Sequence, residues 1–240
     1  MLNGIRSVLR RLDTALRWRF SSGPTPAEVV ETVKNNTREA FEYFWRQERY
    51  INNQYLDASR LEFYDIVAAC CDQLLSGHQS GDMIRIVDIG CGSGHMLHIL
   101  HSKLRHLDLE LFGLDYANSA VAAARRLLPS ATIILGDIFD NCFRSEYFDF
   151  VLSVETFEHL RDPERALVQA VRLAKPGGTL VLTVPNGDKD DWEGHQNFWN
   201  QQQFADFLSC HGPVSSRLVQ SDTVIVGILS KPAAKTAVVR

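Results

Sequence analysis

From Met83 onward the chain alternates short runs of β-branched and aromatic residues with helical segments, and this alternation constrains the fold most strongly. The runs that predict buried strands are residues 84–89, 109–114, 132–135, 148–154, 179–184 and 223–229. Helices are expected over residues 96–104, 119–128, 163–173 and 202–210. Repeated β-α units of this kind build a parallel sheet with helices on both faces. The sequence therefore predicts an α/β fold with a doubly wound, mostly parallel sheet.

The first 80 residues are different, because they are mostly helical in pattern and show no strand alternation. We expect residues 1–80 to form an N-terminal helical lid and residues 81–240 to form the α/β domain. Within residues 1–20, apolar side chains recur every three or four positions and arginines occupy the rest. Such a basic amphipathic helix packs on its own domain or a dimer mate, docks a partner, lies on an anionic membrane surface, or serves as an organellar transit peptide.

Charge and cysteine usage exclude several classes of protein. The 25 basic and 29 acidic side chains leave a net charge of -4, which argues against a dedicated nucleic-acid-binding protein. No apolar run reaches the roughly 18 to 20 residues that a membrane-spanning helix needs. The five cysteines form no CxxC pair, so they indicate neither a disulfide framework nor a zinc site. They are typical of a reducing compartment, and a cytoplasmic location is expected.

A glycine-rich turn follows the first predicted strand, in the sequence DIGCGSG over residues 88–94. Gly90, Gly92 and Gly94 allow a sharp turn in which backbone N–H groups approach a ligand closely. A dinucleotide-binding turn has the pattern GxGxxG or GxGxxA, whereas this chain has His95 at the last position. The turn therefore predicts a nucleotide-type cofactor other than a dinucleotide, with Asp88 two residues before the first glycine.

Acidic residues accompany three successive strands of the predicted sheet. Asp88 lies near the end of the first, Asp115 closes the second in GLDYA, and Asp137 follows the third in GDIFD. Ligands of open α/β sheets bind at the carboxyl ends of the strands, and a carboxylate there accepts hydrogen bonds from ribose hydroxyls. A single acid of this kind is better explained as the cap of the next helix. Three in succession favour a binding site.

These motifs resemble those of the class I S-adenosylmethionine-dependent methyltransferases, and the resemblance covers roughly residues 83 to 230. The matching segments appear in the family's order: DIGCGSG, GLDYA, GDIFD, FDFVLSVETFEHL and LAKPGGTLVLTVPN. The resemblance implies a Rossmann-like fold and S-adenosylmethionine as cofactor. It implies that the three glycines face the methionine part, that Asp115 binds the ribose with Tyr116 beside it, and that Asp137 and Ile138 flank the adenine. In related enzymes N-terminal helices cover the cofactor, so Tyr55 and Arg60 are expected to contact it.

The fourth motif carries the residues that would act on the substrate. Glu155, Glu158 and His159 are spaced i, i+3, i+4, which would place them on one face if the chain is helical there. With His195 they would bind Mg²⁺ or Mn²⁺, and the pattern is similar to those of small-RNA 2′-O-methyltransferases and ubiquinone-pathway O-methyltransferases. Two other interpretations stay open: His159 as a metal-free general base oriented by Glu155, and a purely structural role.

The function expected from the sequence is methyl transfer from S-adenosylmethionine to a small-molecule nucleophile, in the first place a hydroxyl. Three alternatives remain open at this stage. They are another sulfonium chemistry such as cyclisation or carboxypropyl transfer, a metal-dependent RNA 2′-O-methyltransferase, and a non-catalytic partner subunit that only binds the cofactor.

Overall fold

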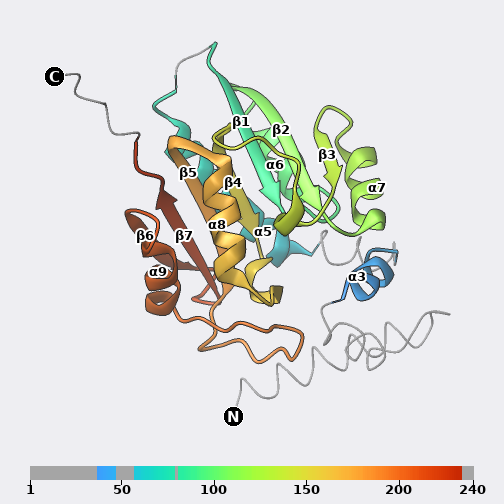
Figure 1. Cartoon of the computed structure of the whole chain (residues 1–240), viewed down its shortest axis with the longest axis vertical. Helices are drawn as coiled ribbons and strands as arrows, with labels where there is room; N and C mark the ends of the chain where they lie inside the picture. Colours follow the sequence, from blue (N-terminus) through green and yellow to red (C-terminus); the bar gives the residue numbers. More distant parts are fainter. Residues whose placement is uncertain (1–36, 47–56, 79–80, 234–240) are drawn as a thin grey trace.

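The computed structural model describes residues 37–46, 57–78 and 81–233, and within them seven strands form a single mixed sheet (Figure 1). The strands are β1 (Met83–Ile89), β2 (Asp108–Asp115), β3 (Thr132–Leu135), β4 (Phe148–Val154), β5 (Ala174–Pro185), β6 (Val214–Val219) and β7 (Val224–Ser230). Their order is β3-β2-β1-β4-β5-β7-β6. Strands β1 to β5 pair in parallel, and β7 runs antiparallel to both of its neighbours. The predicted Rossmann-like, mostly parallel α/β sheet is confirmed.

Helices cover both faces of this sheet. The α-helices are α3 (Arg38–Trp45), α5 (Ala58–Leu75), α6 (His95–Lys103), α7 (Asn118–Leu127), α8 (Pro163–Leu173) and α9 (Gln201–Ser209). Two short 3₁₀ turns, η1 (Ile138–Asp140) and η2 (Phe157–His159), follow β3 and β4. Helices α5, α6 and α7 share one hydrophobic cluster with the sheet, and α8 and α9 share the other. None of the helices in the described ranges has the length and apolar character needed to cross a bilayer.

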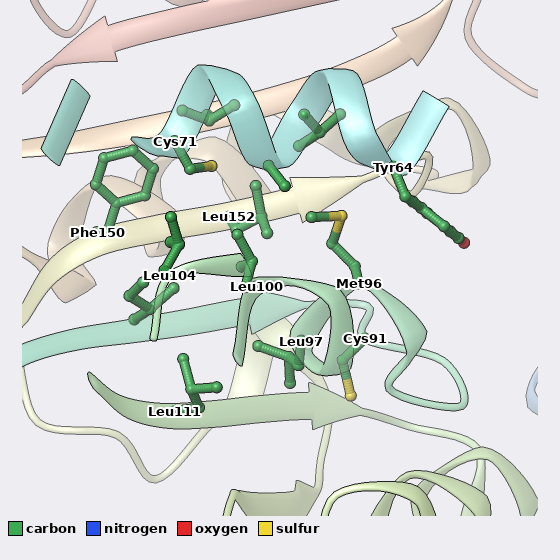
Figure 2. Packing of buried hydrophobic residues seen from close by; sticks show 14 of the residues in the cluster. Tyr64, Cys71, Cys91, Met96, Leu97, Leu100, Leu104, Leu111, Phe150 and Leu152 are labelled. Carbon is green, nitrogen blue, oxygen red and sulfur yellow. The ribbon is translucent and has the colours of Figure 1, made fainter. Parts of the chain in front are cut away.

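The core on the α5 and α6 side is built from complementary apolar faces (Figure 2). Cys71 on α5, Leu100 on α6 and Leu152 on β4 are completely buried and belong to one hydrophobic cluster. Phe150, only 2% exposed, fills the same cluster from β4. Because α5 buries its side chains against this sheet, it is held firmly enough to present residues of its first turn to a site at the sheet edge.

Two features of the sheet differ from the pattern predicted from sequence. Strand β6 was not expected, because Ser215, Ser216 and Arg217 interrupt its apolar residues; as an edge strand it needs no continuous apolar run. Strand β5 begins at Ala174, which pairs with Phe148, and the register then shifts before the regular pairing. Strand β5 therefore starts earlier than the predicted residues 179–184, and the Lys-Pro-Gly-Gly segment, residues 175–178, is an irregularity within it.

The turn between β6 and β7 has an unusual backbone and makes long-range hydrogen bonds. Residues 220–222 all have positive φ, at 51°, 55° and 62°. The side-chain amide of Gln220 donates to the carbonyl and the hydroxyl of Ser59, at 2.6 and 2.8 Å. The carbonyl of Asp222 accepts from the side chain of Asn186 at 2.9 Å. The turn therefore joins the first turn of α5 to the segment that leaves β5.

Candidate functional site

A cavity of about 690 Å³ lies at the carboxyl ends of β1, β2 and β4, which is where the sequence predicted a site. Its volume is in the range of about 300–1,000 Å³ that is typical of small-molecule sites. Helices α3 and α5 also line it, through Phe41, Phe44, Trp45, Arg60 and Tyr64. The cavity therefore lies between the sheet edge and the helices that precede the sheet in the sequence.

The glycine turn after β1 forms part of this cavity wall. Gly90 has φ of 76°, and a Cβ atom there would lie only 2.3 Å from the hydroxyl oxygen of Thr156. Its N–H donates to the carbonyl of Leu114 at 2.8 Å, which ties the turn to the end of β2. Gly92 and Gly94 also have positive φ, at 51° and 81°. The turn thus needs glycine for its backbone conformation and, at Gly90, for lack of space.

The three acids at the ends of β1, β2 and β3 all line the cavity, and two of them also accept hydrogen bonds from backbone N–H groups. Asp115 is buried and accepts the N–H groups of Gly92 and Ala117, each at 2.9 Å. Asp137 accepts the N–H of Phe139 at 2.9 Å and so caps η1. Asp88 is buried, and its Oδ1 has no hydrogen-bond partner among the described residues. Backbone hydrogen bonding and cavity lining therefore occur together at Asp115 and Asp137, and each carboxylate keeps acceptor capacity for a ligand.

Burial of Asp115 predicts a pH-dependent stability. Desolvation raises the pKa of this carboxyl from 3.8 to about 6, against the effect of the N–H donors. Because the folded protein binds this proton more tightly than the unfolded chain, the free energy of unfolding falls as pH rises from 3.8 to about 6. The slope is at most about 1.4 kcal/mol per pH unit. Urea unfolding across this window should show wild type losing stability relative to Asp115→Asn; parallel curves would contradict the assignment.

Glu155 occupies a different place from the one that its spacing predicted. It has φ of 49°, and the helical turn η2 begins only at Phe157, so the expected single helical face is not formed. Its carboxylate accepts a hydrogen bond from the guanidinium of Arg60, forming an ion pair between α5 and the end of β4. Glu155 is thus engaged by Arg60 rather than by His159, and it does not join the cluster formed by Glu158, His159 and His195.

Glu158, His159 and His195 do come together in the cavity, with one potential ligand atom of each within 4.8 Å of the others. Glu158 is 1% exposed, and neither carboxylate oxygen has a hydrogen-bond partner among the described residues. Burial raises the pKa of Glu158 to about 8 and lowers that of His159 to about 3. The general-base role expected for His159 stays a prediction.

Asp190 belongs to the site and was missed from the sequence. Its Oδ2 lies 2.5 Å from Nδ1 of His195, and both side chains are largely buried. The ring of Trp192 packs edge-on against those of His159 and His195, with centroids 5.8 and 4.6 Å apart. An acidic run, Asp188 to Asp191, does precede His195 in the sequence, but spacing alone does not indicate which acid turns inward.

Hydrogen bonds hold the loop that carries Asp190 and His195 against the backbone of Glu158 and Leu160. The carbonyl of Glu158 accepts the N–H groups of Gln196 and Asn197, at 2.8 and 3.1 Å. The side-chain amide of Asn197 donates to the carbonyl of Leu160 at 2.6 Å. The two halves of the cluster, one after β4 and one after β5, are therefore fixed relative to each other by hydrogen bonds.

The remaining predicted residues fall into two groups. Tyr116 and Ile138 line the cavity, and the ring of Tyr116 packs against Phe41 of α3 with centroids 5.6 Å apart. Burial raises the pKa of Tyr116, so its hydroxyl stays protonated. Tyr55 and the basic segment 1–20 lie outside the described residues, and the roles expected for them stay predictions.

Comparison with protein families identifies one match: residues 87–182 match the methyltransferase domain family. Similar curated proteins include the chloroplastic tocopherol O-methyltransferase of Arabidopsis thaliana, which is 32% identical over 106 residues. That alignment covers 42% of this chain and 30% of the relative. The ubiquinone biosynthesis O-methyltransferase of Cereibacter sphaeroides is 29% identical over 136 residues, which cover 55% of this chain and 53% of the relative. The chain thus spans about half or less of the length of these relatives.

Solved structures support the fold. The CurJ carbon methyltransferase aligns with a TM-score of 0.71 over 95% of this chain and 70% of its own, at 14% identity. A Haloferax volcanii protein solved as a complex with the Trm112 methyltransferase activator aligns with a TM-score of 0.60 at 18% identity. That alignment covers 80% of this chain and 97% of the other. Identities this low establish a common fold and no shared substrate.

Proposed function

Residues 87–182 form a methyltransferase domain of the class I S-adenosylmethionine-dependent kind, and from this premise we propose that the protein methylates a hydroxyl group of a small molecule. The observation that carries the proposal is the cavity at the sheet edge. It combines the glycine turn after β1 with acids at the ends of three successive strands, and aromatic side chains of α3 also line it.

The residues of the cavity fit the cofactor. The Asp115 carboxylate keeps acceptor capacity beyond the backbone N–H groups that it accepts, and a ribose hydroxyl can donate to it. Asp88, whose buried Oδ1 has no hydrogen-bond partner in the described part of the chain, lines the cavity together with Gly90 and Gly92, where the polar methionine part would lie. When bound, S-adenosylmethionine supplies a methyl group already activated by the charge of its sulfonium.

Each cofactor contact that the sequence predicts for a described residue is retained in this proposal. Asp115 binds the ribose with Tyr116 beside it, while Asp137 and Ile138 flank the adenine. Gly94 closes the turn as the N-cap of α6. Arg60, which lines the cavity, stays near the cofactor through its ion pair with Glu155. These residues bind and orient; most of the rate enhancement would come from alignment of the acceptor with the methyl group.

The acceptor would lie against the aromatic side of the cavity. His159 packs against Phe41 of α3, with ring centroids 5.5 Å apart, and against Trp192 of the loop after β5. Such walls favour a flat or apolar molecule, and the nearby polar groups of Glu158 and His195 suit a hydroxyl. The O-methyltransferases among the similar proteins also support transfer to oxygen.

The test is product analysis with the full chain. The protein is incubated with S-adenosylmethionine and a panel of phenols, catechols and sugars, and products are identified by mass spectrometry. We expect S-adenosylhomocysteine and a methyl ether in equal amounts. Methylthioadenosine would instead indicate cyclisation or carboxypropyl transfer, and a methylated amine or carbon would overturn O-methylation. Binding of S-adenosylhomocysteine without turnover on any acceptor would favour a non-catalytic subunit, and methylation of RNA alone would exclude a small-molecule substrate.

A further inference from the structure

Glu158 presents an unusual arrangement for a carboxyl group. It is 1% exposed, and both of its oxygens lack a hydrogen-bond partner among the described residues. A buried polar group without a partner costs several kcal/mol, and an isolated charge costs more. Glu158 is nevertheless one of the residues that line the cavity. A cation held by its buried oxygens would offset the cost of their burial.

Two imidazoles face the same point. Nε2 of His159 lies 3.8 Å from Oε1 of Glu158, and the rings of His159 and His195 have centroids 4.9 Å apart. Nδ1 of His159 is buried and has no hydrogen-bond partner among the described residues, so this ring also has a nitrogen available to a ligand. One oxygen and two nitrogens within 4.8 Å of one another match the spacing of ligands around one ion.

Asp190 fixes the orientation of the His195 ring. It lies 2.5 Å from Nδ1 of His195, which assigns the proton of the ring to Nδ1 and leaves Nε2 as the free nitrogen. Metal-binding histidines commonly donate their other N–H to a carboxylate in this way, because it fixes the tautomer and makes the ligand more basic.

We propose that Glu158, His159 and His195 bind one divalent transition-metal ion, of the Mn²⁺, Co²⁺ or Zn²⁺ class, with Asp190 as the positioning residue. The donor set decides the class of ion. Glu155 is bound to Arg60, so one carboxylate and two imidazoles remain, and Mg²⁺ prefers oxygen ligands whereas imidazole suits transition metals. This revises the Mg²⁺ that two carboxylates would favour.

Only the catalytic role of the ion rests on the proposed function. An ion in this position would share the cavity with the acceptor, where it would lower the pKa of the hydroxyl that attacks the methyl group. Binding of the ion itself depends on the three side chains and is measurable without any substrate.

The experiment measures metal binding by the full chain after chelator treatment. Calorimetry with Mn²⁺, Co²⁺, Zn²⁺ and Mg²⁺ is combined with the visible absorption of bound Co²⁺. Wild type should bind one transition-metal ion per chain and bind Mg²⁺ much more weakly. Glu158→Gln and His195→Ala should lose binding, and Asp190→Asn should weaken it by about 10–100-fold. Glu155→Gln should bind as wild type does, as should His98→Ala, the matched control in which an exposed histidine of α6 is removed.

Binding of S-adenosylhomocysteine by every variant shows that each one folds and separates the two proposals. A wild-type protein that binds S-adenosylhomocysteine and binds no transition metal overturns the metal site and leaves the proposed function standing. Equal affinity for Mg²⁺ and Mn²⁺, or loss of binding in Glu155→Gln, overturns the donor set. Metal binding that persists in Glu158→Gln and His195→Ala places the ion elsewhere and overturns the site.

Discussion

Replacing Asp115 with alanine is expected to weaken the binding of S-adenosylhomocysteine about tenfold or more. In the proposed complex the substitution leaves the ribose hydroxyls without an acceptor, at a cost of about 1–3 kcal/mol. It also removes the acceptor of the Gly92 N–H, at 2.9 Å, and so loosens the glycine turn. Each 1.4 kcal/mol lost corresponds to about a factor of ten in the dissociation constant, which calorimetry resolves readily.

A nearby acid provides the control for this prediction. Asp140 is exposed, belongs to η1, and is not among the residues that line the cavity. Asp140→Ala should bind S-adenosylhomocysteine with wild-type affinity. If Asp115→Ala folds and also keeps that affinity, Asp115 is not part of the cofactor site.

The largest loss of stability is expected for Phe157→Ala. Phe157 is 1% exposed, lies in η2 directly before Glu158, and packs against Phe207 of α9 with ring centroids 6.2 Å apart. Removing a buried phenylalanine ring costs about 3–5 kcal/mol. In a chain of this size that lowers the melting temperature by roughly 6–20 °C. Thermal unfolding followed by circular dichroism measures the change.

Phe198 is the matched control, because it is a phenylalanine of the same region that is 46% exposed. Phe198→Ala should change the free energy of unfolding by no more than about 0.5 kcal/mol. Equal melting temperatures for the two variants would mean that Phe157 does not anchor η2 in the core.

The fold was predictable because most of the strands are parallel and central. Strand β4 lies inside the sheet and has the bounds predicted for it, since buried strands form continuous apolar runs that are limited by turn residues. Strand β3 is an edge strand, and its bounds were predictable because three of its four residues are apolar. The same rule explains the failure at β6, where an edge strand alternates with polar residues. A run of apolar side chains indicates a buried strand. Strand β6 buries little of its surface and so lacks such a run.

Some residues of the site were likewise predictable from the sequence, and others were not. The glycine turn, Asp88, Asp115 and Asp137 were predictable, because topology brings the carboxyl ends of neighbouring parallel strands together whatever the loops do. The place of Glu155 was not, because it depends on a left-handed backbone at a non-glycine residue and on Arg60, which lies 95 positions away. Contacts between segments so distant in sequence leave no local pattern. Asp190 was missed for the related reason that its loop has no regular periodicity.

The β6–β7 turn has a consequence for engineering of this protein. Hairpin tips are usually chosen to host a fused tag or an inserted domain, because they are exposed and make few contacts. This tip, through Gln220 and Asp222, holds both the start of α5 near Arg60 and the chain that leads to His195. An insertion there would act on two sides of the cavity at once, although it lies outside the cavity itself. A reporter is better fused beyond residue 233, past the last strand of the sheet.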